Sequence, residues 1–430
     1  MILTRLRIAI ATGAVASMML LAGCTAASTA QDTTAAATGT DLFDSSVVHT
    51  ISVEFDQADY DAIIAAYETD GSKDWMSATV TIDGTVLENV GLRLKGNSSL
   101  RGLANSTGDG TISADDPAGI PWLIRLDKYV DGQTYDGRSE LIVRGNNSET
   151  SMNEAVALEL IGLAGLATQE ATPARFSVNG GDAALRLVIE SPDDELWTDA
   201  TFGEDGITYE AETEGDYSYR GEDPAAYVDA FTQQSNTDDE NLQPVIDLLE
   251  FVDTATDEEF EANLGDYLDV DAFANYLAIE TLIDNFDDID GPGNNSYLRW
   301  DAATGLITVV AWDHNLALGV SNGGPGGGQG GAPDGGDRPG EDGAMPGGPM
   351  QGGGMGGRGG NPLSERFMAT ASFAALVDAA TASLQAELYD SGEAQSILDE
   401  WSSVLTAQAS DLVSADTIST EAASIAAYFD

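Results

Sequence analysis

The sequence predicts an α+β fold in which a mainly β lobe is followed by a mainly α lobe. In the first half, apolar and polar residues alternate in segments such as VVHTISVEF and WMSATVTIDGTVLENVGLRLKG, which is typical of strands. From about residue 222 the apolar spacing becomes helical, as in VDAFANYLAIETLI. A chain of 430 residues is long enough to bury a large core and to form two or three lobes.

The first half contains three further signals of local structure. Asp83-Gly84 is a tight-turn signal between two strand-like runs, and WLIRLDKYVDG continues the strand pattern. SELIVRG leads into the helical run AVALELIGLAGL, before which Ser151 and Glu154 have the spacing of a capping box. ATPARFSVNGGDAALRLVIE is a predicted hairpin whose turn is at residues 179–181.

The second half begins with four segments of helical spacing, namely DPAAYVDAFTQQ, LQPVIDLLEFVDT, DEEFEANLGDYL and VDAFANYLAIETLI. A β-hairpin is predicted next, because SYLRW and LITVVAW are two short apolar runs joined by the turn-like DAATG. Helices are expected to resume after Asn361-Pro362-Leu363 and to continue to the end of the chain.

The N-terminal residues are typical of a bacterial lipoprotein signal. Arg5 and Arg7 precede an apolar run that ends in Leu21-Ala22-Gly23-Cys24, which resembles a lipobox. We therefore expect residues 1–23 to be a signal peptide, Cys24 to be lipidated and residues 24–40 to be a flexible tether. The expected localisation is extracytoplasmic, with membrane attachment only through this lipid anchor.

The remaining chain divides at a Gly-rich stretch. Residues 41–320 form the expected folded core, residues 321–361 a Gly- and Met-rich low-complexity insertion, and residues 362–430 a C-terminal helical part. Glycine is so frequent in the insertion that spacings resembling a phosphate-binding loop carry no information, and no strand precedes them. We expect a flexible surface segment there.

Composition excludes several classes of function. The formal net charge of −56 disfavours nucleic acid as a partner. Cys24 is the only cysteine, and His49 and His314 are the only histidines. The chain therefore has few residues for a thiol nucleophile, a zinc site or a Ser-His-Asp triad. Carboxylate chemistry and hard metal ions remain the best supported.

The predicted hairpin brings three polar residues to one end. Asp290 and Asn295 precede its first strand and Asp313 follows its second, so all three emerge at the open end and can converge on one ion. A calcium EF-hand loop fails on two ligand positions, since Phe286 and Tyr297 occupy them. Two alternatives remain open: a carboxylate pair for glycoside hydrolysis, and a solvated loop in a chain with 73 acidic residues, for which Asp284 and Asp287 are the first candidates.

Several motifs together resemble one known family. GLRLKGNSSLRG (91–102), IRLDKY, SETSMNEAVALEL, NSYLRW and AWDHN occur in the order found in the CotH family, the spore-coat-protein-H-like atypical kinases. The similarity runs from about residue 45 to 320, and a Gly- and Met-rich insertion followed by Asn-Pro-Leu is also common in that family. The resemblance implies an atypical protein-kinase-like two-lobed fold. It also implies transfer of phosphate from a nucleotide, expected to be ATP, to a hydroxyl of a surface or secreted protein, with Mg²⁺ or Mn²⁺.

The resemblance also assigns roles to individual residues. Asp290 matches the catalytic Asp, and the step of five residues to Asn295 equals that in the catalytic loop of protein kinases. Asn295 and Asp313 match metal ligands. The block expected at the nucleotide phosphates comprises Arg93, Lys95, Gly96, Asn97, Ser98 and Ser99.

Three assignments have alternatives. Arg125 or Lys128 could be the cation that faces the phosphates, and Glu154 could pair with such a cation or only complete the capping box. At the third metal position many relatives have Asp where this chain has Asn315, which keeps one oxygen ligand but removes a charge. The alternative function is therefore a non-catalytic pseudokinase, a surface or envelope-assembly binding module.

Overall fold

The structure is a computed structural model that describes residues 41–104, 112–212, 216–285, 287–289, 295–320 and 361–429. The expected signal peptide, Cys24 and the tether lie outside these ranges, as do Asp290 and residues 321–360 of the Gly-rich segment. The assignments made for them stay predictions.

Within the described residues, seven strands close into a barrel. Neighbouring strands are antiparallel except at the closure, where β1 pairs with β6 in parallel, for example Ile51 with Phe176. In their order around the barrel, the strands are β1 (His49–Phe55), β2 (Met76–Ile82), β3 (Thr85–Leu94), β4 (Trp122–Arg125), β5 (Glu140–Val143), β7 (Ala184–Glu190) and β6 (Ala171–Val178).

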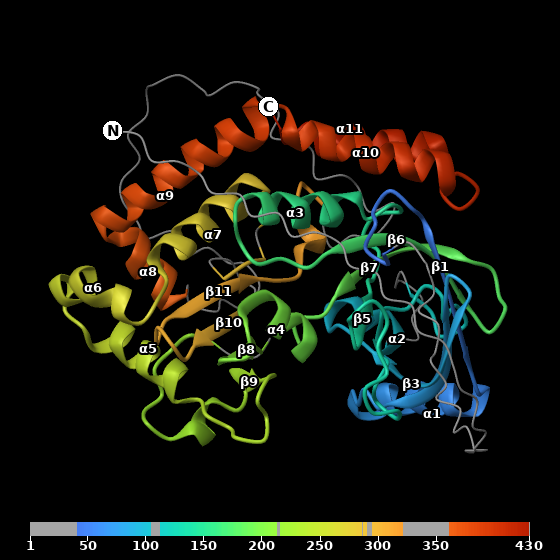
Figure 1. Cartoon of the computed structure of the whole chain (residues 1–430), viewed down its shortest axis with the longest axis horizontal. Coiled ribbons are helices and arrows are strands. Elements are labelled where there is room, and N and C mark those ends of the chain that lie inside the picture. Colours follow the sequence, from blue (N-terminus) through green and yellow to red (C-terminus); the bar gives the residue numbers. More distant parts are fainter. Residues whose placement is uncertain are drawn as a thin grey trace, which may run out of the picture. The chain divides into compact units, whose positions relative to one another are not determined.

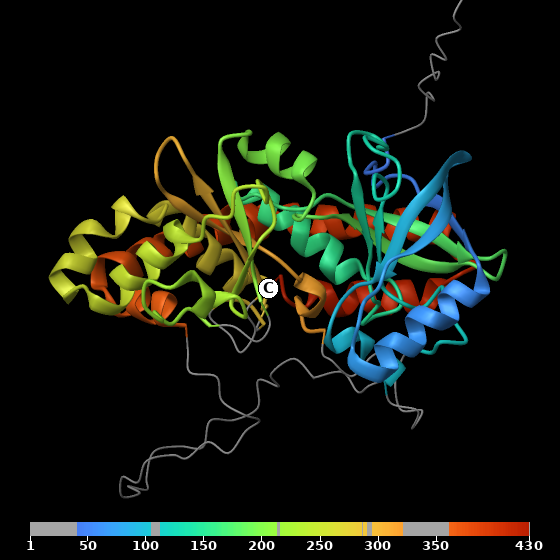
Figure 2. The same ribbon diagram turned by 90° about the horizontal axis from the view of Figure 1, so that it is seen from below.

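A second sheet and the helices make up the rest of the described chain (Figures 1 and 2). The sheet has the order β11 (Ile307–Ala311), β10 (Ser296–Asp301), β8 (Gly206–Ala211) and β9 (Phe231–Gln233). The α-helices are α1 (Gln57–Asp70), α2 (Arg101–Ala104), α3 (Met152–Leu163), α4 (Glu195–Phe202), α5 (Gln243–Thr254), α6 (Asp257–Asn263), α7 (Val270–Leu282), α8 (Pro362–Ala369), α9 (Ala371–Leu384), α10 (Glu393–Gln408) and α11 (Ala415–Ala426).

The expected kinase-like arrangement of a β lobe followed by an α lobe is wrong. The structure has a closed seven-strand barrel plus helices, and four more strands, from residues 206 to 311, form a second sheet among the helices. The barrel was not predictable because it closes by a parallel pairing of β1 with β6, more than 100 residues apart, which no turn signal marks.

Alternation along the barrel strands separates two hydrophobic cores. On β5, Leu141 and Val143 face the barrel interior, whereas Ile142 packs into the larger core that contains α3 and the second sheet. On β3, Leu92 and Leu94 likewise face inward. The residues that alternate with these inward-facing positions therefore lie on the outer face of the barrel. This alternation determines which charged side chains of the strands contact the larger core.

The helix α3 is the central element of the larger core. Every residue from Met152 to Ile161 except Glu159 is buried, and the helix packs against α7, α10 and α11. Figure 1 shows α10 and α11 running beside α3. No single described helix is long and apolar enough to cross a membrane, although α8 with residues 371–390, bent by 92°, passes the same test as a pair.

The local predictions had mixed outcomes. The two hairpins at residues 83–84 and 179–181 and the helices α3, α5, α6 and α7 are confirmed. The segment DPAAYVDAFTQQ is not an α-helix, because a 3₁₀ turn (Pro224–Tyr227) is followed by β9. The helix α1 was not predicted. The capping box at Ser151 does not form: this residue has φ 53° and its side chain makes no capping hydrogen bond.

Candidate functional site

The hairpin formed by β10 and β11 brings Asn295 and Asp313 to one end, as predicted. Ser296 pairs with Ala311 at this end, so Asn295 just precedes the pairing and Asp313 just follows it. The Asn295 amide donates to both the main-chain oxygen (2.7 Å) and Oδ2 (3.0 Å) of Asp287. Burial, together with the nearby charge of Asp313, raises the pKa of Asp287. Asp287 is therefore part of this cluster, and its expected place in a solvated loop is wrong.

Asp313 has an unusual backbone conformation at the end of the hairpin. Its φ of 64° is in the left-handed region, which few residues other than glycine adopt. The short helix η4 (His314–Leu316) begins immediately afterwards, and His314 Nε2 lies 2.9 Å from Glu280 Oε1 in α7. Burial alone would lower the pKa of His314, but the charge and hydrogen bond of Glu280 outweigh burial and raise this pKa. The buried pair ties the end of the hairpin to α7.

A buried ion pair joins Asp313 to α3. Arg144 Nη2 lies 2.8 Å from Glu154 Oε1 and also contacts Asp313 Oδ1. Arg144 and Glu154 are only 8% and 2% exposed. Burial raises the pKa of Glu154, although Arg144 offsets part of the effect. Glu154 thus pairs with a cation, but this cation is Arg144 and not one of the phosphate-facing candidates Lys95, Arg125 or Lys128.

Arg144 was not selected from the sequence, because strand alternation gives its parity but not what covers that face. It follows β5 and has the parity of Ile142, which packs into the core around α3. A cation at this parity points toward α3 and meets Glu154. Because nothing in SELIVRG says which face of the strand α3 covers, the sequence alone did not distinguish Arg144 from a solvated end of a strand.

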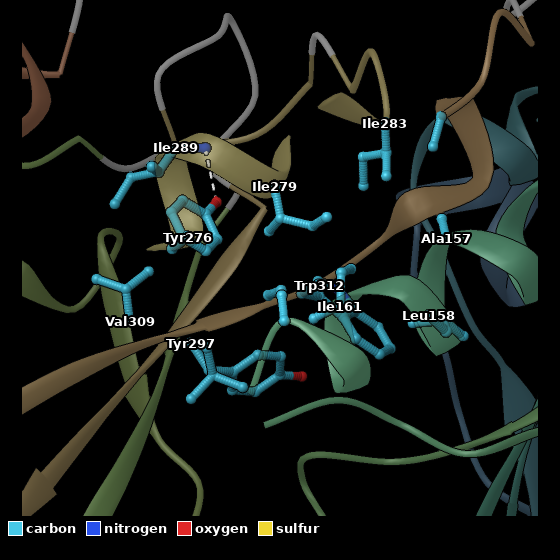
Figure 3. Close-up of a cluster of buried hydrophobic side chains, with 14 of the residues drawn as sticks. Ala157, Leu158, Ile161, Tyr276, Ile279, Ile283, Ile289, Tyr297, Val309 and Trp312 are labelled. Atoms are coloured by element: carbon cyan, nitrogen blue, oxygen red, sulfur yellow. Dashed lines mark hydrogen bonds between the residues drawn. The ribbon is translucent and has the colours of Figure 1, made fainter. Parts of the chain in front are cut away.

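The predicted phosphate block lies next to this ion pair. Lys95 Nζ is 3.2 Å from Asp193 Oδ2, and Asp193 Oδ1 accepts a 2.8 Å hydrogen bond from Tyr297. Lys95 Nζ and the Arg144 guanidinium carbon each lie 5.6 Å from the centre of the Trp312 ring. Figure 3 shows Trp312 and Tyr297 within a cluster of buried hydrophobic side chains that also includes residues of α3 and α7. Both cations therefore lie beside Trp312, close to the end of the hairpin.

The loop after Lys95 folds tightly toward Arg144. Gly96 has φ 101°, and a Cβ there would lie 2.2 Å from Ser99 Oγ, so only glycine fits. A Cβ on Gly145, the residue after Arg144, would lie 3.4 Å from Ser99 Cβ. Ser99 is thus packed beside the backbone that carries Arg144, which brings the block into one site with Asp313.

The other predicted residues are less central. Asn97 accepts a 2.9 Å hydrogen bond from Lys73, and Ser98 begins the short helix η1 (Ser98–Leu100). Arg125 pairs with Asp127 (2.9 Å) and Glu140 (3.4 Å). The main-chain oxygen of Asn315 accepts a 3.0 Å hydrogen bond from the side-chain amide of Asn153 in α3. The cations Arg93 and Lys128 both lie over Trp75, at 4.7 and 5.0 Å from the ring centre.

Comparison with known proteins identifies the family of this chain. Residues 93–424 match the model of the family described as CotH kinase protein. The chain belongs to the CotH kinase protein family. It is also 21% identical over 192 residues to the inner spore coat protein H of Bacillus subtilis (strain 168), an alignment that covers 44% of this chain and 52% of the relative. The chain therefore spans about half the length of the curated relative that it matches.

The residues of this CotH-family chain supply oxygen atoms suited to a hard metal ion. Asp313 and Asp287 lie close enough for the charge of one to raise the pKa of the other, and Asn295 bridges to Asp287. Within the described ranges, no group of three or more His, Cys, Asp or Glu residues could hold a metal. Magnesium is commonly bound by one or two carboxylates together with phosphate oxygens and water, so this donor set fits the ion.

Sequence reasoning missed three members of the site: Arg144, Asp193 and Asp287. Each is an ordinary charged residue whose importance arises from its partner: Asp313 for Arg144 and Lys95 for Asp193, both far away in the sequence, and the nearby Asn295 for Asp287. Asp193 had no local signal, whereas Asp287 was included in the acidic cluster but interpreted as solvated.

Proposed function

We propose that this CotH-family chain transfers the terminal phosphoryl group of a nucleotide, expected to be ATP, to a hydroxyl group of a surface or secreted protein. The observation that carries the proposal is the junction of Asp313, Asp287 and Asn295 with the buried Arg144–Glu154 ion pair. Family membership supports it at the coarser level, since the family is described as kinase protein.

Each residue has a stated part in this proposal. Asp313 and Asn295, with Asp287, would hold Mg²⁺ or Mn²⁺, which when bound neutralises charge on the phosphates. Lys95 and the loop of residues 96–99 would contact the donor phosphates. Arg144 is held by Glu154 with little freedom to move, so its positive charge is preorganised beside Asp313.

The transfer step requires a base near the acceptor hydroxyl. We assign this role to Asp290, which lies outside the described residues, on the basis of its spacing from Asn295 and the family resemblance. The acceptor oxygen forms a bond to the terminal phosphorus, the bond from phosphorus to the nucleoside diphosphate breaks, and the hydroxyl proton passes to Asp290.

The proposed setting is extracytoplasmic. The relative named inner spore coat protein H is, by its name, a coat protein. Together with the lipobox-like Leu21-Ala22-Gly23-Cys24, this supports a chain that is anchored by lipid outside the cytoplasm and acts on surface or secreted proteins.

Cys24→Ala is expected to release the protein from the membrane fraction or to block its maturation. Unchanged fractionation and migration would contradict the anchor.

The decisive experiment compares binding with transfer. Asp313→Ala should abolish Mg²⁺-dependent ATP binding in calorimetry, because it removes a ligand and its charge. Asp290→Asn should keep binding while transfer of labelled γ-phosphate falls by roughly 10² to 10⁴, the usual loss when a general base is removed. Asp284→Asn, which alters an exposed carboxylate of the same segment, serves as the matched control and should change neither quantity.

Three other outcomes have distinct meanings. Metal-dependent ATP binding without transfer in the wild type would favour the non-catalytic binding module. Unchanged ATP affinity in Asp313→Ala would remove the proposed site. Equal loss of transfer in Asp284→Asn would show that the assay reports general charge rather than the chemistry of Asp290.

A further inference from the structure

Lys95 is a largely buried cation whose charge is maintained by its neighbours. Its side chain is only 15% exposed, and Nζ lies 3.2 Å from Asp193 Oδ2. Burial alone would lower the pKa of Lys95, but the charges of Asp193 and Glu210 outweigh burial and raise this pKa. Glu210 accepts a 2.7 Å hydrogen bond from Gln234, whereas Asp193 accepts one from the Lys95 ammonium itself. Asp193 is therefore the carboxylate that holds this ammonium.

The turn that carries Asp193 is fixed by its own contacts. Asp193 lies between β7 and α4, and the next residue, Asp194, is the N-cap of α4. The Asp194 carboxylate accepts hydrogen bonds from the backbone N–H groups of Leu196 (3.0 Å), in α4, and of Ser139 (2.7 Å), immediately before β5. These two bonds hold the turn against both elements. Because lysine has a long flexible stem, the short side chain of Asp193 fixes the position of Lys95 and not the reverse.

The other oxygen of Asp193 is bound to the hairpin. Oδ1 accepts a 2.8 Å hydrogen bond from the hydroxyl of Tyr297, which is buried in β10. Tyr297 follows Asn295, a proposed metal ligand, by two residues, and its ring packs edge-on against Trp312 with 5.6 Å between the ring centres (Figure 3). The contacts from Tyr297 through Asp193 to Lys95 therefore join β10 of the second sheet to the end of β3 in the barrel.

Glu154, the carboxylate expected to pair with a phosphate-facing cation, does not have this role. It pairs with Arg144 at 2.8 Å, and this pair is separate from the pair formed by Lys95 and Asp193. The two pairs approach each other at Trp312, since Lys95 Nζ and the Arg144 guanidinium carbon each lie 5.6 Å from the centre of its ring. Each cation beside Trp312 therefore has its own carboxylate.

We propose that Asp193 is the positioning residue for Lys95 and, through Tyr297, holds its ammonium at a fixed distance from the metal ligands of the hairpin. This inference rests on the proposed function, in which Lys95 contacts the donor phosphates. An ammonium donates several hydrogen bonds, so the bond to Asp193 leaves others for phosphate oxygens. A carboxylate that only competed with phosphate for Lys95 would weaken nucleotide binding. The two roles therefore predict opposite effects when Asp193 is replaced.

Mg²⁺-dependent ATP binding, measured by calorimetry on the mature chain, distinguishes these roles. Asp193→Asn keeps the shape but has one acceptor oxygen where Asp193 uses two, so it should weaken binding by roughly tenfold, the factor for one charge-assisted hydrogen bond. In a Lys95→Met background the same change should add no further loss, because Asp193 acts through Lys95. Tighter binding in Asp193→Asn, or additive losses in the double variant, would overturn the proposal.

A second measurement needs no nucleotide, so it tests the role of Asp193 even where the proposed transfer fails. Acetic anhydride reacts with the neutral amine of lysine, and mass spectrometry gives the rate for Lys95 relative to Lys128. Asp193→Asn should raise the relative rate several-fold, because loss of the carboxylate lowers the pKa of Lys95 and releases its ammonium. Tyr297→Phe removes the hydroxyl that fixes Asp193 and should raise the rate to a smaller extent.

Glu210→Gln is the matched control, because it removes a second nearby charge from Lys95 but leaves the contact with Asp193 in place. It should raise the acetylation rate less than Asp193→Asn does. Equal rates in the two variants would show that only local charge matters, and an unchanged rate in Asp193→Asn or Tyr297→Phe would show that the contact does not hold Lys95; either result would overturn the proposal. Melting temperatures show whether each variant is folded. If the wild type binds no ATP, the proposed function fails while the acetylation rates still decide the role of Asp193.

Discussion

At the scale of single residues, Arg144 and Glu154 form a buried ion pair in the candidate site. Both side chains are almost completely buried, so each depends on the other for neutralisation. Removing one partner from a buried ion pair leaves an uncompensated charge, which commonly costs 3–5 kcal/mol, whereas replacing both by apolar groups costs far less. Because an apolar pair would be about as stable, the contribution of this ion pair is better explained by its contact with Asp313 than by stability.

The first prediction follows from this asymmetry. Arg144→Met should lower the free energy of unfolding by about 3–5 kcal/mol, because Glu154 remains buried without its cation. The double variant Arg144→Met with Glu154→Leu should recover most of this loss. Urea unfolding at pH 7 measures both. A double variant no more stable than the single one would contradict the view that the stranded charge is the cause.

Glu140 gives the second prediction, on pH dependence. Burial, reinforced by the charge of Asp193 and opposed by Arg125, raises the pKa of Glu140 from 4.5 to about 7. The folded state therefore binds a proton more tightly than the unfolded state between these values. Stability from this group is present below pH 4.5 and is lost as pH rises to about 7.

Glu140→Gln should remove this part of the pH dependence. Relative to the wild type, the variant should gain stability between pH 5 and 8, by up to about 3 kcal/mol for the full shift. Urea unfolding at both pH values measures the difference. Exposed Glu68→Gln is the matched control. If wild type and Glu140→Gln change equally with pH, the buried carboxyl is not responsible.

At the scale of elements, the start of α3 depends on a distant helix. The side chain of Ser151 does not cap α3, and the turn just before the helix is held from outside: Glu421 in α11 accepts hydrogen bonds from Glu149 N (2.8 Å) and Thr150 N (3.0 Å). The turn that precedes Glu154 is thus fixed by α11, near the C-terminus, and not by its own sequence.

The third prediction tests this contact between helices. Glu421→Ala should destabilise the protein by about 1–3 kcal/mol, because Glu149 N, Thr150 N and Thr150 Oγ1 lose their acceptor. Chemical denaturation measures this loss. In addition, the variant should exchange amide hydrogens faster than the wild type, and this increase should be largest at the start of α3. Glu68→Ala, in α1, is the control for removing an exposed helical glutamate. The same loss in both variants would show that the hydrogen bonds of Glu421 to the turn before α3 do not stabilise the protein.

At the scale of the whole molecule, net charge is the dominant feature. A formal charge of −56 creates repulsion between carboxylates over the entire surface, and this repulsion is greater in the compact state than in the unfolded chain. Four cations, Arg93 and Lys128 beside Trp75 and Lys95 and Arg144 beside Trp312, lie over aromatic rings within this acidic chain.

The fourth prediction concerns ionic strength. Raising NaCl from about 10 to about 500 mM should increase the melting temperature, because salt screens repulsion between exposed carboxylates. Scanning calorimetry at constant pH measures the change, and an equivalent sucrose series controls for general solvent effects. A melting temperature that falls with salt would mean that exposed ion pairs, such as Arg175–Asp411, outweigh the repulsion.

The sequence by itself determined the features that depend on neighbours along the chain. The hairpin of β10 and β11, the helices α3 and α7 and the family followed from local periodicity, turn residues and motif order. The convergence of Asn295 and Asp313 was also predictable, because a hairpin fixes its own register.

Only the tertiary structure decided which distant segments meet. The parallel pairing of β1 with β6 closes the barrel and corrects the two-lobed expectation, and strand parity then turns Arg144 toward α3 and Arg93 to the outer face of the barrel. Local periodicity shows that a strand has two faces but not what covers each one. Coverage is set by packing between elements far apart in sequence, so the partners of the charged residues could not be predicted from the sequence alone.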